Sequence, residues 1–192
     1  SKAFVFITPK SILVFDLVQK CVRRFGDMST VKSGLSGKTV VITGGGGVLC
    51  SGFSKVMAEQ GCNVAVLDLK LESAAKVADE IVSGGGSAVA AEANVLDLDS
   101  LKKAHDKVIA AFGKCDILIN GAGGNNPRGT TSKEYFEPGD IEDNDVLSFF
   151  DLDFKGVSFV FDLNFLGTMM ATQIFAKDML GREGCAIINI SS

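Results

Sequence analysis

The chain has 192 residues, of which 46% are apolar, and a formal net charge of -4. This length and composition suffice for one buried core, so we expect one main domain. The acidic balance argues against a nucleic-acid partner, because affinity for a phosphate backbone depends on lysine and arginine that displace counterions.

The five cysteines predict neither a disulfide framework nor a zinc site. They are odd in number, lie far apart in the chain and form no CxxC pair. We therefore expect a reduced, cytoplasmic compartment and no bound metal. Asp16 interrupts the apolar N-terminal stretch, so we also expect no membrane span.

Residues 1–36 are expected to form an extension to a main domain of residues 37–192. Pro9 suits the first position of a helix, apolar residues then recur at helical spacing, and Gly26 suits its end. An amphipathic helix of this kind could lie on a membrane surface. Asp16 and the short basic end favour packing on the domain or on a partner subunit instead.

From Lys38 onward, apolar strands alternate with amphipathic helices. The expected strands cover residues 39–43, 64–69, 87–93, 116–120 and 185–190. Strands separated by helices in this way pair in parallel, with helices on both faces of the sheet. The predicted fold class is α/β, with a doubly wound parallel sheet.

A long polar and acidic loop of residues 121–145 precedes the last helix, and loops of this length usually form a lid or an insertion. Residues 157–180 are apolar on almost every side, so the helix should be buried against the sheet and against something else. A second copy of the chain is the natural candidate, giving a dimer or tetramer. A sheet ending at its fifth strand would leave an open edge, so we expect a longer natural protein.

A glycine run, Gly44 to Gly47, connects the first strand to the first helix. Glycine permits a tight turn and lets a pyrophosphate approach the helix N-terminus, where free N–H groups favour an anion. A plain glycine-rich turn is the alternative, and the run alone is a weak signal. Its position between a strand and a helix favours a dinucleotide site.

Asp68 ends the second strand, at about the distance from the glycine run where a dinucleotide site has an acid on the adenosine ribose. A carboxylate there accepts hydrogen bonds from both ribose hydroxyls and repels a 2′-phosphate. The residue therefore predicts NAD rather than NADP as cofactor. The alternative is a strand-end turn residue without a ligand.

With three further motifs, the chain resembles the short-chain dehydrogenase/reductase family over residues 38–192. The segment Asn120-Gly-Ala-Gly resembles the family's NNAG motif, and Asn164 lies where the family has an active-site asparagine. The end of the last expected strand resembles that of the family, with Ser192 at its catalytic serine. The resemblance implies a Rossmann-like three-layer sandwich.

Within the family, the motifs are most similar to the D-mannonate oxidoreductase, or fructuronate reductase, branch. This implies hydride transfer between nicotinamide C4 and the keto or hydroxyl carbon of a small substrate, a sugar acid. The implied catalytic residues are Ser192 and Asn164. The residues implied to bind NAD are Gly44, Gly46, Gly47, Val48, Leu49, Asp68, Leu69, Asn94, Val95, Asn120, Ala122 and Gly123.

The chain departs from the family pattern at several of these positions. Val48 and Cys50 stand where the TGxxxGxG motif has glycines, and Gly121 stands where NNAG has its second asparagine. Asn94 stands where the family usually has an aspartate near the adenine. Its amide offers both a donor and an acceptor, so contact with the adenine is still expected.

In the family, a catalytic tyrosine and lysine in a Tyr-x-x-x-Lys helix follow the serine by about a dozen residues. Tyr135 has no lysine four residues later and is not expected to replace that tyrosine. We therefore expect no hydride transfer from residues 1–192 alone. Two alternatives stay open: a catalytically inactive nucleotide-binding module, or another polyol or sugar dehydrogenase.

The remaining polar residues give weaker indications. His105, the only histidine, is expected to be a solvated surface residue. The acids of the long loop lack the spacing of a calcium loop and are expected to be solvated. Polar residues after the fourth strand could touch a substrate, because ligands bind at the carboxyl ends of such strands. They are Asn125, Asn126, Thr130 and Thr131.

Overall fold

The computed structural model describes residues 5–7 and 34–191 and is built on one parallel sheet in the strand order β1-β6-β5-β2-β3-β4. Each neighbouring pair of strands is parallel. The strands are β1 Val5–Ile7, β2 Thr39–Thr43, β3 Asn63–Asp68, β4 Ser87–Glu92, β5 Ile117–Asn120 and β6 Ala186–Ile190. The predicted doubly wound parallel sheet is confirmed, and the expected strand bounds differ by at most one residue at either end.

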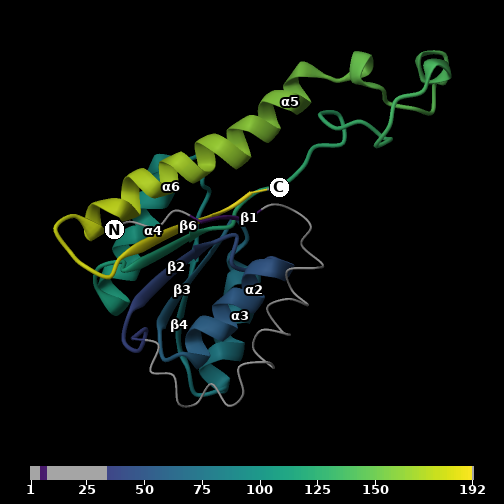
Figure 1. Ribbon diagram of the computed structural model, residues 1–192. Helices are drawn as coiled ribbons and strands as arrows, with labels where there is room; N and C mark the ends of the chain where they lie inside the picture. Colours follow the sequence, from purple (N-terminus) through teal and green to yellow (C-terminus); the bar gives the residue numbers. More distant parts are fainter. Residues whose placement is uncertain (1–4, 8–33, 192) are drawn as a thin grey trace.

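Helices cover both faces of the sheet, which makes three layers (Figure 1). On one face lie α2 Val48–Glu59 and α3 Leu71–Ser83. On the other lie α4 Leu98–Phe112 and a long helix made of four consecutive segments. These are α5 Phe154–Phe161, the π-helical η4 Asp162–Leu166, α6 Gly167–Phe175 and the 3₁₀ turn η5 Ala176–Met179.

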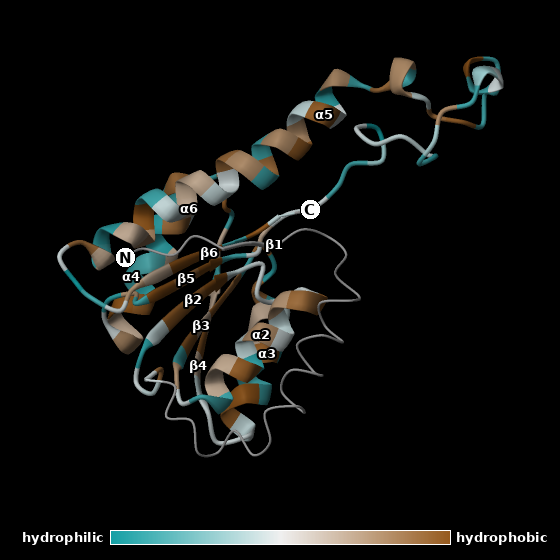
Figure 2. Ribbon diagram, in the orientation of Figure 1, coloured by the Kyte–Doolittle hydropathy of each residue, from teal (hydrophilic) through white to brown (hydrophobic). Residues whose placement is uncertain are grey.

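The core is split in two by the sheet, because successive strand residues point to opposite faces. Val40 and Ile42 of β2 face α2 and α3, whereas Val41 between them faces α4 and α6. The middle residues of the central strands are apolar (Figure 2), as expected of parallel strands buried on both faces.

The edge beyond β6 is covered, which corrects the expectation of an open edge after the last strand. β1 pairs with β6 in the register Val5 with Ile188 and Ile7 with Ile190. The segment Val-Phe-Ile has high strand propensity, and the outer side of β6 offers unpaired backbone groups. The helix expected after Pro9 and the predicted catalytic Ser192 lie outside the described residues.

The long helix buries only the side that faces the sheet. Ala171 and Phe175 are fully buried, whereas Phe161 is 67% exposed and Phe165 is 65% exposed. Burial on both faces is therefore not found within the described chain. The stretch Phe154–Met179 is long and apolar enough to cross a membrane by length and composition alone, contrary to expectation. In this fold it covers one face of the sheet.

At the amino ends of the strands, His105 is not the solvated residue that was expected. Its Nε2 lies 3.0 Å from Oδ2 of Asp178, and its ring makes an edge contact with Phe175 at a centroid distance of 5.3 Å. The same Asp178 oxygen accepts a hydrogen bond from the buried backbone N–H of Cys115 at 3.0 Å. His105 therefore joins α4 to the end of the long helix.

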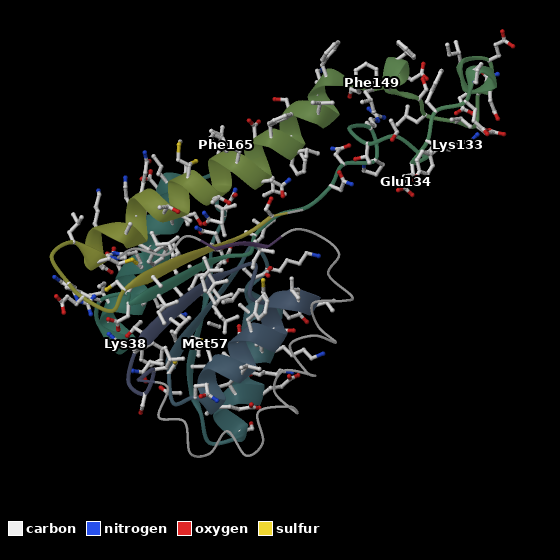
Figure 3. The ribbon with its side chains drawn as sticks, viewed as in Figure 1. Lys38, Met57, Lys133, Glu134, Phe149 and Phe165 are labelled. Carbon is white, nitrogen blue, oxygen red and sulfur yellow. The ribbon has the colours of Figure 1, made fainter. Side chains whose placement is uncertain are left out.

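The loop between β5 and α5 forms an arm of residues 125–153 that projects from the body (Figure 1). Lys133, Glu134 and Phe149 lie in this arm, far from the sheet (Figure 3). Two 3₁₀ turns, η2 Pro138–Ile141 and η3 Phe149–Asp151, lie within it. Most of its acids are solvated as expected, but Asp140 is buried and its Oδ1 lies 2.6 Å from the Nζ of Lys133.

Candidate dinucleotide-binding site

A cavity of about 380 Å³ opens where β2, β3 and β5 end, at the carboxyl edge of the sheet. Ligands of doubly wound sheets bind at this edge. Most of the residues predicted to bind NAD line it: Gly44, Gly47, Val48, Leu49, Asp68, Leu69, Asn94, Val95, Ala122 and Gly123. Sequence reasoning missed four further lining residues, Cys50, Ala93, Gly121 and Leu163.

The glycine run packs too closely for side chains. Gly44 has φ of 65°, and a Cβ there would lie 2.9 Å from the backbone of Ala122. A Cβ at Gly45 would lie 2.7 Å from the side chain of Val66, and its N–H donates to the carbonyl of Leu67 at 2.8 Å. The run is therefore held against β3 on one side and against the end of β5 on the other.

The N-terminus of α2 faces this cavity with unpaired backbone donors. The first helical bond runs from Ser51 N–H to the carbonyl of Gly47 at 2.9 Å, so the three N–H groups before it have no partner within the helix. In the part of the chain that the structure describes, no side chain caps α2, and its first turn holds no acid. These N–H groups and the helix dipole suit an anion such as a pyrophosphate.

Asp68 links the glycine run to the end of β3. Its Oδ2 accepts a hydrogen bond from Gly46 N–H at 3.0 Å, and its Oδ1 accepts one from Lys70 N–H at 3.0 Å. A carboxylate has about four acceptor sites, so both oxygens can accept further hydrogen bonds. Gly46, predicted to bind NAD, does not line the cavity itself, but its N–H group holds the Asp68 carboxylate that does.

Asn94 and Leu69 lie at the part of the cavity next to β4. The Oδ1 of Asn94 accepts a hydrogen bond from Leu96 N–H at 3.0 Å. This leaves the Nδ2 group of Asn94, which donates no hydrogen bond within the described residues, available to a ligand. Val95 is buried beneath this part, and Leu69 is exposed at its rim.

Asn120, also predicted to bind NAD, lies away from the cavity. It is fully buried, and its Nδ2 donates to Asn189 Oδ1 at 2.8 Å and to Thr172 Oγ1 at 3.0 Å. These two bonds join β5 to β6 and to α6. Asn120 therefore supports the sheet beneath the site and does not line it.

Asn164 lies in the π-helical segment η4 and fastens the base of the arm to the long helix. Its Nδ2 donates to the carbonyl of Gly124 at 2.7 Å, and its Oδ1 accepts from Gly124 N–H at 3.1 Å. A Cβ at Gly123 would lie 2.5 Å from that Oδ1. Single π-helical turns within α-helices often mark functional sites.

A second, larger groove of about 1110 Å³ lies on the other side of this contact, between the long helix and β6. Its apolar wall includes Phe161, Phe165 and Met169. Its polar lining comprises Asn125, Asn164, Thr168, Thr172, Gln173, Lys177, Asn189 and Ser191. Among the residues guessed to touch a substrate, Asn125 lines this groove, whereas Asn126, Thr130 and Thr131 do not.

Titratable groups at the two cavities give no metal site. Across residues 5–7 and 34–191, His, Cys, Asp and Glu form no group of three that could hold a metal ion. Burial, and to a smaller extent the charge of Asp68, raise the pKa of the Cys50 thiol to about 11. Cys50 is therefore a neutral wall residue at physiological pH and not a thiolate nucleophile.

The family model described as short chain dehydrogenase matches residues 38–192, which include every strand except β1. The chain therefore belongs to the short-chain dehydrogenase family. The resemblance noted in the sequence is confirmed at this level.

Two known proteins are similar to most of this chain. An uncharacterized oxidoreductase of Haemophilus influenzae is 52% identical over 158 residues, which are 82% of this chain and 55% of that protein. The uncharacterized oxidoreductase UxuB of Bacillus subtilis is 44% identical over 165 residues, 86% of this chain and 58% of that protein. The chain thus spans little more than half the length of these relatives.

A crystal structure from Haemophilus influenzae is similar in both sequence and fold. It is 51% identical, with a TM-score of 0.77, and the match covers 82% of this chain and 55% of that one. Its name, D-mannonate oxidoreductase, is provisional, and it contains bound NAD.

Proposed function

We propose that this chain is the nucleotide-binding part of an NAD-dependent oxidoreductase that transfers hydride to or from a keto or hydroxy sugar acid such as fructuronate or mannonate. The observation that carries the proposal is the position of Asp68. Its carboxylate lines the cavity beside the glycine run and is held by two backbone N–H groups. The bound NAD of the Haemophilus structure and the names of the relatives support the same reading.

The residues present fit a dinucleotide. The free N–H groups of the first turn of α2 would hold the pyrophosphate, and Asp68 would accept hydrogen bonds from the adenosine ribose. The Nδ2 group of Asn94 would donate to the adenine. When bound, the nicotinamide supplies the carbon that gives or takes the hydride.

The chain's own part in the reaction is to position the reactants and exclude water. Asn164 and Gly124 form the boundary between the dinucleotide cavity and the larger groove, so a substrate in the groove would meet the cofactor there. Thr168, Gln173 and Lys177 offer donors suited to the hydroxyls and carboxylate of a sugar acid. We propose that Asn164 and Ser192 act in catalysis, as the family resemblance implies.

The cofactor proposal is tested by fluorescence titration of the intact protein with NADH and NADPH. We expect much tighter binding of NADH than of NADPH. Asp68→Ala should narrow this gap in binding free energy by about 1 to 3 kcal/mol, because charge-assisted hydrogen bonds to NADH are lost. Asp68→Asn is the matched variant, because it retains an oxygen that can accept from Gly46 N–H but lacks the charge. Asp79→Ala, an exposed acid on α3, should leave the gap unchanged. Equal affinities of the unchanged protein for the two dinucleotides would refute the proposal.

The substrate proposal is tested by following NADH absorbance with a panel of sugar acids, neutral polyols and simple alcohols. Turnover should be greatest with a sugar acid, while residues 1–192 alone should give none with any of them. Tight binding of NADH without turnover in the intact protein would favour the inactive nucleotide-binding module. Preference for a neutral polyol would move the assignment to another sugar dehydrogenase.

A further inference from the structure

Two departures from the family pattern meet at one point of the dinucleotide cavity. Cys50, in the first turn of α2, stands where the family has a glycine, and Gly121, just after β5, stands where it has an asparagine. A Cβ built on Gly121 would overlap the Sγ of Cys50. The side chain at one position therefore occupies the space that a side chain at the other would need.

The contact lies where the two walls of the cavity join. Cys50 is 4% exposed and packs in the core beneath α2, yet both residues line the cavity. Next to them, Thr43 Oγ1 accepts hydrogen bonds from the N–H groups of Gly121 and Ala122, each at 3.1 Å. A Cβ on Gly121 would also lie 3.0 Å from the carbonyl of Thr43, which leaves the segment after β5 little room to move.

We infer that Cys50 and Gly121 form one steric unit that sets the separation between the start of α2 and the end of β5, and that Cys50 is a positioning residue for the dinucleotide. The inference deepens the proposed function and rests on it. The two departures from the family pattern then compensate each other. In the family pattern the side chain after β5 fills the space at this contact, and here the side chain of Cys50 in α2 fills it. Neither position can take the family's residue alone without overlap or a void.

The test is a double-mutant cycle in the intact protein, with Gly121→Ala, Cys50→Gly and both together. Dissociation constants for NADH and for AMP are measured by titration, and stability by urea unfolding. Gly121→Ala should weaken NADH binding by about tenfold or more, because an added methyl at this contact must push the two walls apart. In the Cys50→Gly background the same change should cost about twofold or less, because the overlap with the thiol is then gone and only the Thr43 carbonyl, at 3.0 Å, remains close.

AMP is the matched ligand, since it carries the adenosine ribose that would meet Asp68 but only one phosphate. Its affinity should change less than that of NADH in Gly121→Ala. In the Cys50→Ser background, where the side chain is nearly equal in size, Gly121→Ala should weaken NADH binding as much as in the unchanged protein, because shape and not thiol chemistry sets the contact.

Three results would distinguish a failure of this inference from a failure of the proposed function. Additive effects of the two substitutions on NADH binding would overturn the inference while leaving the proposed function intact. Equal losses for NADH and AMP would also overturn it, because they would mark a general loss of packing. Coupling in urea unfolding with no dinucleotide binding by the unchanged protein would support the steric unit but refute the proposed function.

Discussion

The surroundings of Cys50 raise the pKa of its thiol. Its thiol is buried beside the Asp68 carboxylate, and both burial and that charge disfavour the thiolate. The pKa is raised from an ordinary value of 9.0 to about 11. Cys50 thus stays protonated in the folded chain over a pH range in which the unfolded chain loses the proton.

The first prediction follows from the sign of this shift. Below pH 9 the thiol is protonated in both states and has no effect on the pH dependence of stability. Between pH 9 and 11 only the unfolded state releases the proton, so the free energy of unfolding should fall by roughly 2 to 3 kcal/mol. Urea unfolding of the unchanged protein and of Cys50→Ser, followed over this range, isolates the contribution, because the other cysteines are common to both. Parallel pH curves would contradict it.

At the scale of the elements, α4 and the end of the long helix are joined through one buried carboxylate. Asp178 accepts from Cys115 N–H and lies against His105, while Arg182 donates from Nη1 to the carbonyl of Cys115 at 3.0 Å. The arrangement lies at the amino ends of the strands, away from the dinucleotide cavity. We assign it to stability and not to ligand binding.

The second prediction concerns this carboxylate. Asp178→Ala should lower the free energy of unfolding by about 1 to 3 kcal/mol, because it leaves the buried N–H of Cys115 without an acceptor. The control is Asp106→Ala, whose carboxylate lies 3.9 Å from the other ring nitrogen of His105 but is exposed. That change should cost less than about 0.5 kcal/mol. Similar losses for both variants would mean that the exposed charge, and not the buried acceptor, holds the helices together.

The third prediction concerns η4, where the long helix meets the base of the arm. Asn164→Ala removes both hydrogen bonds to Gly124 but leaves Leu163, which lines the dinucleotide cavity, in place. We expect kcat of the intact protein to fall about tenfold or more, with a change of less than about threefold in the dissociation constant for NADH. Kinetics and titration of the same preparation measure the two effects. A large loss of NADH affinity with unchanged kcat would assign Asn164 to the cofactor instead.

For the whole molecule, the outer side of the long helix is its most conspicuous surface. Phe161, Phe165 and Met169 are exposed along it, next to the larger groove. Exposed apolar patches of this kind mark interfaces. We propose that a second copy of the chain covers this side of the helix, through a two-fold contact between identical faces.

The fourth prediction tests that contact by sedimentation velocity. The intact protein should sediment as a dimer or tetramer, and Phe161→Glu with Phe165→Glu should shift it toward a smaller species, because two buried like charges would meet across the two-fold axis. Val82→Glu, at an exposed apolar position on α3, is the control and should leave the assembly unchanged. A monomeric unchanged protein would contradict the prediction.

The sequence alone predicted the order and type of the strands from β2 onward, because parallel strands buried on both faces are apolar runs separated by glycine-rich turns and helical patterns. It also predicted most of the dinucleotide cavity, since motifs after consecutive parallel strands come together at one edge of the sheet. Asp68 was predicted in this way, from its position at the end of β3, whereas Asn94 was predicted from the family resemblance.

Only the tertiary structure decided which distant residues touch. Four contacts join segments that are far apart in the chain. β1 pairs with β6, and His105 lies against Asp178. Asn120 binds Asn189 instead of lining the cavity, and Cys50 fills the space beside Gly121. Local sequence patterns indicate the period of a helix or strand and which of its faces is buried. They do not indicate which other element covers that face. Packing sets that choice, because each side chain fills space that others leave, and such complementarity appears only when the layers are assembled.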